Sequence, residues 1–140
     1  MIDQITVFLE NDKGRLAALC RTLGDAGISM HALTFADTAQ YGVARVIADS
    51  PSKAYEVLNE KGFRASLTKV FAVEVPDRAG SLATLMEALD RADINVEYAY
   101  CFASKDGMAT EVLRIDNHDE AEQVIGDAGF RVVKPEELYA

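Results

Sequence analysis

The sequence predicts an α+β protein in which one small βαββαβ module occurs twice, head to tail. Two observations lead to this prediction. The chain repeats itself at an almost constant spacing, and each copy has strand and helix patterns in the same order. At 140 residues, the chain is long enough for two such modules, each with a small core. We therefore expect modules at residues 1–68 and 69–140.

The repeat runs through most of the chain. Gly14 matches Gly80 and Leu16 matches Leu82, so the first part of the two copies is offset by 66 residues. The triplet Gly62-Phe63-Arg64 matches Gly129-Phe130-Arg131, where the offset is 67. An ordered series of this kind indicates duplication, with one extra residue in the second copy.

The first half of each copy predicts a strand followed by a helix. Apolar residues alternate at residues 5–9 and 71–75, which is typical of a strand. Apolar residues at helical spacing follow at 16–26 and 82–92, with Leu19 and Leu85 central in each stripe. Gly27 is a suitable residue to end the first helix, and Asp93 takes its place in the second copy.

The second half of each copy predicts a hairpin, a helix and a last strand. We expect second strands at 28–35 and 94–102 and third strands at 43–48 and 109–115. The connecting turns hold Gly42 in one copy and Lys105-Asp106-Gly107 in the other. Second helices are expected to start at Ser50-Pro51 and Asn117, the latter with Glu120 as a capping box, and to stop at Gly62 and Gly129. The last strands are expected at 63–67 and 130–133.

This order is the ferredoxin-like arrangement, in which two helices cover one face of a four-stranded antiparallel sheet. Only Thr68 and Lys69 separate the last strand of one copy from the first strand of the next. A linker that short leads us to expect two modules packed side by side, whose sheet edges can join.

Composition limits the classes of partner. The formal charge of −9 disfavours nucleic acid and anionic membranes. The first residues lead straight into a strand pattern, and no apolar run is long enough to span a membrane, so we expect a cytoplasmic protein. Cys20 and Cys101 lie in different copies without the spacing of a metal or redox motif, and Cys20 falls on an apolar helix stripe, so we expect it to be buried and inert.

The turn between the first strand and first helix carries the clearest chemical signal. It reads Glu-Asn-Asp-Lys-Gly-Arg-Leu from Glu10 and Pro-Asp-Arg-Ala-Gly-Ser-Leu from Pro76. A glycine entering a helix permits close approach to the backbone, and free first-turn N–H groups attract a carboxylate or phosphate. Asn11 or Asp77 could accept a hydrogen bond from an ammonium group. The alternative is that these residues are helix caps and turn formers only.

The ordered motifs resemble those of the ACT domain, a small-molecule-sensing module of amino-acid metabolism. The resemblance rests on Asp/Asn-x-x-Gly-x-Leu at the turn followed by Ala-Gly-Ile-Ser-Met or Ala-Asp-Ile-Asn-Val. It covers both copies and leaves out only the tail after Lys134. The family typically binds an amino acid at the interface between paired modules. By position, the resemblance implies these ligand-binding residues: Asn11, Asp12, Lys13, Gly14, Arg15, Leu16 and Ser29, and Asp77, Arg78, Ala79, Gly80, Ser81, Leu82 and Asn95.

Other candidates are weaker. His31 and His118 have no second His or Cys at metal spacing, so a solvent or core histidine is the favoured interpretation and no metal is expected. The alternating aromatic residues from Tyr98 to Phe102 could line a pocket, although such residues more often pack in a sheet. No set of acid, base and nucleophile clusters in the sequence, so neither an enzyme nor a cofactor is expected.

The sequence thus predicts a regulatory protein that binds a free amino acid. It predicts a homodimer acting on an unidentified regulated protein, because small fused modules leave surfaces that a symmetric partner can cover. The alternative is a ligand-free scaffold for protein–protein interaction.

Overall fold

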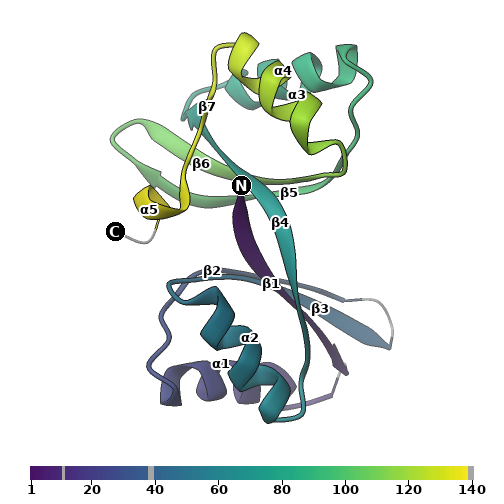
Figure 1. Ribbon diagram of the computed structural model, residues 1–140, viewed down its shortest axis with the longest axis vertical. Helices are drawn as coiled ribbons and strands as arrows, with labels where there is room; N and C mark the ends of the chain where they lie inside the picture. The colour runs from purple at the N-terminus through teal and green to yellow at the C-terminus, as the bar shows by residue number, and fades with distance from the viewer. Residues whose placement is uncertain (11, 38–39, 139–140) are drawn as a thin grey trace. The chain divides into compact units, whose positions relative to one another are not determined.

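The computed structural model describes residues 1–10, 12–37 and 40–138 of the chain (Figure 1). The chain divides into two compact units, Asp3–Thr68 and Lys69–Ala140, the latter together with Met1–Ile2. We call them the first unit and the second unit.

Strands and helices alternate in the first unit as the repeat predicts. The strands lie in the order β2-β3-β1-β4, and both β1 and β2 pair with β3 in antiparallel fashion. The elements are β1 (Ile2–Glu10), α1 (Arg15–Asp25), β2 (Met30–Asp37), β3 (Tyr41–Ala48), α2 (Pro51–Glu60) and the start of β4 (Arg64–Pro76).

The second unit repeats this arrangement and adds a short final helix. Its strands lie in the order β7-β4-β6-β5. Each strand takes the place of its counterpart in the first unit, so the predicted α+β fold with two βαββαβ modules is confirmed. The elements after β4 are α3 (Ser81–Arg91), β5 (Val96–Lys105), β6 (Met108–Ile115), α4 (His118–Asp127), β7 (Arg131–Val132) and α5 (Pro135–Leu138).

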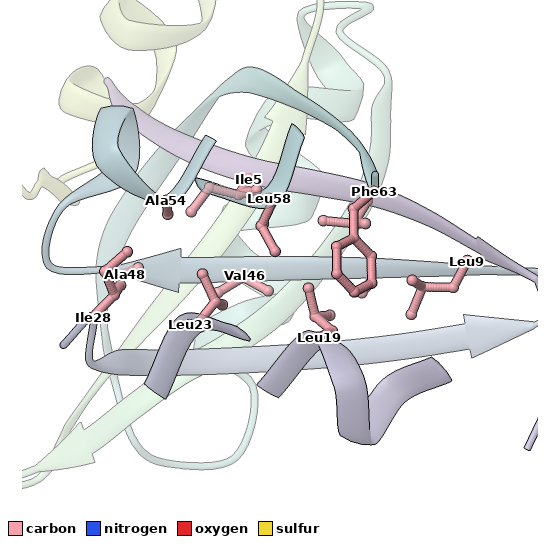
Figure 2. Packing of buried hydrophobic residues seen from close by; sticks show 12 residues of the cluster. Ile5, Leu9, Leu19, Leu23, Ile28, Val46, Ala48, Ala54, Leu58 and Phe63 are labelled. Carbon is pink, nitrogen blue, oxygen red and sulfur yellow. The ribbon is translucent and has the colours of Figure 1, made fainter. Parts of the chain in front are cut away.

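Each unit has its own core between one sheet face and two helices. In the first unit, Leu19 and Leu23 of α1 and Leu58 of α2 have no exposed surface. Figure 2 shows these side chains directed toward Ile5 and Val46 of the sheet. The second unit buries the corresponding residues, Leu85 and Leu89 of α3 and Ala121 and Ile125 of α4, against Phe71, Val73, Leu113 and Ile115.

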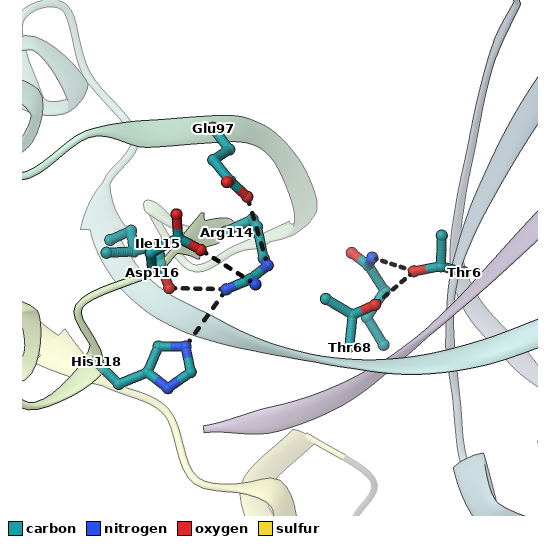
Figure 3. Close-up of polar contacts among 8 residues, drawn as sticks. Thr6, Thr68, Glu97, Arg114, Ile115, Asp116 and His118 are labelled. Carbon is teal, nitrogen blue, oxygen red and sulfur yellow. Dashed lines mark hydrogen bonds and ion pairs between the residues drawn. The ribbon is translucent and has the colours of Figure 1, made fainter.

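The expected linker at Thr68 and Lys69 is part of a strand. β4 continues through both residues, with Arg64–Thr68 in the first unit and Lys69–Pro76 in the second. Thr68 is β-branched and favours a strand, and its hydroxyl lies 2.8 Å from that of Thr6 on β1 (Figure 3). The prediction of two strands with a break was wrong because neither residue interrupts a strand.

The second strand of each copy begins two residues later than predicted. Ile28 and Ile94 are buried, but the N–H groups of both bond back to the preceding helix, to the carbonyls of Leu23 at 3.0 Å and Leu89 at 2.9 Å. These bonds close the helix end after the left-handed residues Gly27 and Asp93, as predicted for the helix stop. Because the N–H groups of Ile28 and Ile94 bond the helix, they cannot pair with a neighbouring strand, and each strand begins later.

Gly42 lies within β3 rather than in the predicted turn. It is buried, and a Cβ atom there would lie 2.2 Å from the ring of Phe35 on the neighbouring strand. The glycine therefore makes room for an aromatic ring. In the second copy, the turn between β5 and β6 does hold Asp106 and Gly107, both with positive φ.

The predicted helix starts are correct in position, but their side chains do not cap. α2 follows Ser50 with Pro51 at its first position, and α4 follows Asn117, yet neither side chain bonds a helix N–H group. Asn117 Nδ2 donates instead to Glu120 Oε2 at 2.7 Å. The expected capping box is replaced by a bond between two side chains.

The C-terminal helix α5 was not predicted. Glu137 accepts a hydrogen bond from the backbone N–H of Lys134 at 2.8 Å and one from Arg131 Nη1 at 2.6 Å. Arg131 also bonds Glu74 on β4, so one guanidinium joins two carboxylates. β7 comprises only Arg131–Val132, shorter than the expected 130–133, because the chain turns into α5 directly afterwards.

Acidification is expected to release α5. The backbone N–H of Lys134, and then Arg131, lower the pKa of the Glu137 carboxyl below its ordinary value of 4.5. A group with a lowered pKa in the folded state stabilises at higher pH, and that contribution is lost as pH falls through the folded pKa. Amide signals around Leu138, followed by NMR as pH is lowered from 6, should therefore shift in the acid range. In Glu137→Gln this transition should be absent; an identical transition in the variant would assign it to another group.

Candidate functional site

The turn between β1 and α1, and its counterpart between β4 and α3, have the same backbone geometry. Gly14 and Gly80 precede their helices with φ of 91° and 89°, in the left-handed region that favours glycine. Among the residues that the structure describes, no side chain caps either helix. The glycines therefore act as turn formers, as the alternative interpretation expects, whereas capping by a side chain is not seen among the described residues.

Asp77 bonds the β5–β6 hairpin and does not cap α3. Its carboxylate accepts a hydrogen bond from the hydroxyl of Ser104 on β5 at 2.8 Å, and its N–H bonds the carbonyl of Gly107 at 2.8 Å. The residue is exposed, and these two bonds fix it against the β5–β6 hairpin. An oriented, exposed carboxylate of this kind can accept a hydrogen bond from an ammonium group.

Two N–H groups at the start of α3 are open to a ligand. Leu82 and Ala83 are exposed, and neither N–H finds an acceptor among the residues that the structure describes. The next N–H, that of Thr84, bonds the Gly80 carbonyl at 3.0 Å and begins the helical pattern. Unpaired N–H groups at a helix start favour an anion, since the helix dipole is positive there.

The predicted site residues do not all come together within one unit. Asn11 lies outside the described residues. Ser29 precedes Met30, which pairs with Ala48, whereas Glu10 at the turn pairs with Tyr41. Seven residues of β3 separate these positions, about 23 Å at 3.3 Å per residue.

The second unit separates its residues in the same way. Asn95 precedes Val96, which pairs with Ile115, whereas Pro76 at the turn pairs with Met108. Asn95 is exposed, as is Ser29, whose N–H bonds the Asp49 carboxylate at 3.2 Å. The ligand-binding role of all these residues remains a prediction.

Each unit has a cavity beside its turn, at the same place in the repeat. In the second unit the cavity measures about 360 Å³, and the predicted residues Arg78 and Ser81 line it. In the first unit it measures about 250 Å³, and the predicted residue Arg15 lines it. Six pairs of corresponding residues line both cavities: Phe8 and Glu74, Glu10 and Pro76, Arg15 and Ser81, Tyr41 and Met108, Gly62 and Gly129, and Arg64 and Arg131. Asp12, Lys13, Gly14 and Leu16, and Ala79, Gly80 and Leu82, lie in or beside the turns without lining these cavities.

Sequence reasoning missed the arginine at the start of the last strand. Arg64 and Arg131 both line these cavities, yet the triplets that contain them served only to detect the repeat. A charged residue kept at the same place in both copies was the available signal. The two arginines differ in their surroundings, because Arg131 is paired with Glu74 and Glu137.

The weaker candidates, His118 and Cys20, lie among side chains of their own units. His118 Nε2 lies 3.4 Å from Arg114, and its ring contacts Phe71 edge to face. Arg114 also pairs with Glu97 at 3.5 Å and Asp116 at 3.3 Å (Figure 3). The described ranges contain no group of three or more His, Cys, Asp or Glu side chains suited to a metal ion.

Cys20 is only half-buried, because its place on α1 lies beside the core stripe, so the prediction of a buried thiol was wrong.

No described helix is long and apolar enough to cross a membrane. The aromatic residues from Tyr98 to Phe102 lie in β5, and Phe102 lines a second cavity of that unit, of about 350 Å³.

Comparison with known proteins identifies the family. Residues 1–140 match the family described as an ACT domain pair. The chain belongs to that family. The resemblance seen in the turn motifs is thereby confirmed, and it extends through the tail after Lys134. A search of the curated proteins found no match.

Solved structures agree with this membership. Protein BT0572 from Bacteroides thetaiotaomicron is 31% identical, covers 98% of this ACT domain pair and 94% of its own chain, and has a TM-score of 0.91. The ligand-free regulatory subunit of aspartate kinase from Thermus thermophilus is 17% identical, with 91% of each chain covered and a TM-score of 0.65. The corresponding subunit from Thermus flavus is also 17% identical, covers 90% and 91%, and has a TM-score of 0.64. At that identity the two subunits share the fold.

Proposed function

We propose that this ACT domain pair is a regulatory protein that binds a free amino acid at the turn that precedes α1 or α3. Family membership supports a sensing role, and two structures of similar fold are regulatory subunits by name. The observation that carries the proposal is the turn before α3, where open N–H groups and an oriented carboxylate lie within six residues of one another.

These groups complement a zwitterion. The N–H groups of Leu82 and Ala83 would bind the α-carboxylate of an amino acid, as helix starts bind anions. The carboxylate of Asp77 would accept the ammonium group, and its bond from Ser104 reduces the cost of orienting it. Gly80 adds no side chain between the two, so a small ligand can approach the backbone.

A sensor must transmit ligand binding to another protein or to another copy of itself. Binding shifts an equilibrium only if the ligand has different affinities for two states, so we propose that occupancy changes contact with a regulated protein or with a second copy of this chain. A homodimer remains part of the proposal. The role proposed is regulatory, with catalysis left to that partner.

A protein-binding scaffold is the second candidate, and one surface favours it. In the first unit, Phe8, Ala36, Tyr41 and Val43 line a cavity of about 370 Å³ on the sheet, together with Arg64. Phe8 and Tyr41 are more than half exposed. Thermal unfolding separates the candidates, because a ligand at 100 times its dissociation constant stabilises by about 2.7 kcal/mol whereas a scaffold gains nothing from amino acids.

Replacing Asp77 by alanine is expected to weaken amino-acid binding about tenfold while leaving the fold intact. The variant loses a charge-assisted hydrogen bond to the ligand, and the residue is exposed, so little stability depends on it. Ser104→Ala should weaken binding less, since it removes only the bond that orients Asp77. Isothermal titration calorimetry against the neutral amino acid that gives the largest thermal shift measures both effects.

Asp90→Ala is the matched control, because Asp90 is an exposed aspartate near the other end of α3. It should bind as the parent does. Parental affinity in Asp77→Ala, together with a normal melting curve, would remove Asp77 from the site. Absence of binding by the parent protein to every amino acid would remove the proposed function.

A further inference from the structure

The cavity beside the turn of the first unit carries three charged side chains that do not neutralise one another. Glu10, Arg15 and Arg64 line it, and in the part of the chain that the structure describes none of the three forms an ion pair. This is notable in a protein with 14 basic and 23 acidic residues, where carboxylates outnumber their partners.

Arg15 is held in place by an aromatic ring rather than by a carboxylate. Its guanidinium carbon lies 4.8 Å from the centre of the Phe63 ring, a cation–π contact. Its Nε is buried and has no hydrogen-bond partner among the described residues. A buried donor without a partner is costly, and a ligand that accepts its hydrogen bond removes that cost.

The cavity of the second unit is also lined by two arginines and one glutamate, but only one arginine keeps its position, and that arginine is paired with the glutamate. Serine replaces Arg15 at Ser81, proline replaces Glu10 at Pro76, and Arg131, which corresponds to Arg64, already bonds Glu74 and Glu137. Arg78 also lines that cavity, but no second unpaired arginine joins it there. The two cavities therefore share a position in the fold and a formal charge, and they differ in whether their charged side chains are already paired.

We propose that the first-unit cavity selects an acidic amino acid, so that this repeat binds aspartate- or glutamate-like ligands and the other does not. The inference rests on the proposed amino-acid-binding function and names its ligand class. Two guanidinium groups and one carboxylate are the complement of a molecule with two carboxylates and one ammonium group. The planar guanidinium donates two parallel hydrogen bonds to a carboxylate, which makes arginine suited to this recognition.

The size of the cavity agrees with this ligand class. Its volume of about 250 Å³ lies below the range of about 300–1,000 Å³ that holds drug-sized molecules. A free amino acid is smaller than such molecules. Phe8 and Tyr41 add apolar wall beside the charged groups, and the amino acid's methylene groups would pack there.

The experiment compares ligands that differ by one charge. Isothermal titration calorimetry of the intact protein is carried out with L-aspartate, L-asparagine, L-glutamate, L-glutamine and succinate. We expect L-aspartate or L-glutamate to bind at one site per chain, at least about tenfold more tightly than the matching amide. Arg64→Gln should lower the affinity for the acidic amino acid about tenfold and abolish the preference over the amide. Glu10→Gln should weaken binding of the amino acid but not of succinate, which has no ammonium group.

Arg21→Gln is the matched control, because Arg21 is an exposed arginine of the same unit that lies on α1 and pairs with Asp25. It should leave all affinities unchanged. Circular dichroism checks that each variant folds, and the comparison of acid with amide needs no variant at all. Equal affinity for acid and amide, or parental behaviour of Arg64→Gln, would overturn this inference. Binding of a neutral amino acid would still support the proposed function. If no amino acid binds, both fail together.

Discussion

Replacing Leu85 by alanine is expected to destabilise the second unit by about 2–5 kcal/mol, and Leu19→Ala to do the same in the first unit. Both side chains have no exposed surface and lie at the centre of the stripe by which α3 and α1 contact their sheets (Figure 2 for Leu19). Truncation removes apolar contacts and leaves a cavity in a small core. Urea denaturation followed by circular dichroism gives the free energy of unfolding.

Leu82→Ala is the control for this prediction. Leu82 lies on the same helix as Leu85 but is 39% exposed, so its truncation should cost much less. Equal losses for Leu82→Ala and Leu85→Ala would contradict the helix register that the repeat predicts.

Valine in place of Gly80 is expected to destabilise the start of α3 by about 1–3 kcal/mol. The cost comes from the backbone, because φ is 89° and β-branched residues avoid that region. Crowding plays no part, since a Cβ atom at Gly80 would meet no atom within 4 Å. Asparagine tolerates the left-handed region, so Gly80→Asn should cost less. Thermal unfolding of the two variants measures the difference, and equal melting temperatures would contradict the assigned geometry.

This strain changes how the turn should be tested for binding. A valine at Gly14 or Gly80 alters the turn itself, so a loss of ligand affinity would mix backbone distortion with crowding of the ligand. Replacing the exposed side chain of Asp77 avoids this difficulty, because it keeps the glycine whose positive φ the turn requires and removes only the bond from Ser104. Replacement of Asp77 therefore reports on the ligand contact more directly.

The fold could be predicted from residues whose role is local. The alternation at residues 71–75, the stripes centred on Leu19 and Leu85, and the helix stops at Gly62 and Gly129 each depend on neighbours in sequence, and all appear in the structure. Duplication strengthened every one of these predictions, since an ambiguous pattern in one copy was resolved by the other.

Features set by distant contacts could not be predicted. β4 continues through Thr68 where it lies beside β1, and the hydroxyls of Thr68 and Thr6 lie 2.8 Å apart there. α5 depends on Arg131, whose two carboxylate partners come from β4 and from α5 itself. A four-residue helix has too few turns to leave a periodic pattern in the sequence.

The candidate site also has a part that could be predicted from local sequence and a part that depends on distant contacts. The turn motif located Gly14 and Gly80 because glycine at a helix start is a local signal. Arg64 is 49 residues away from Arg15 in sequence and joins it only through the pairing of the fold, so the motif could not include it. Whether an arginine is neutralised is likewise decided by its neighbours in space, as Arg131 and Arg64 illustrate.

The central claim is that this ACT domain pair binds a free amino acid at its helix-start turns, and NMR tests it most directly. Amide spectra of the ¹⁵N-labelled protein are recorded while each of the twenty amino acids is added to millimolar concentration. The account predicts that at least one amino acid causes saturable shifts, largest at Gly80, Leu82 and Ala83 or at their counterparts beginning with Gly14. Spectra that stay unchanged with all twenty, or shifts confined to residues far from both turns, would contradict it.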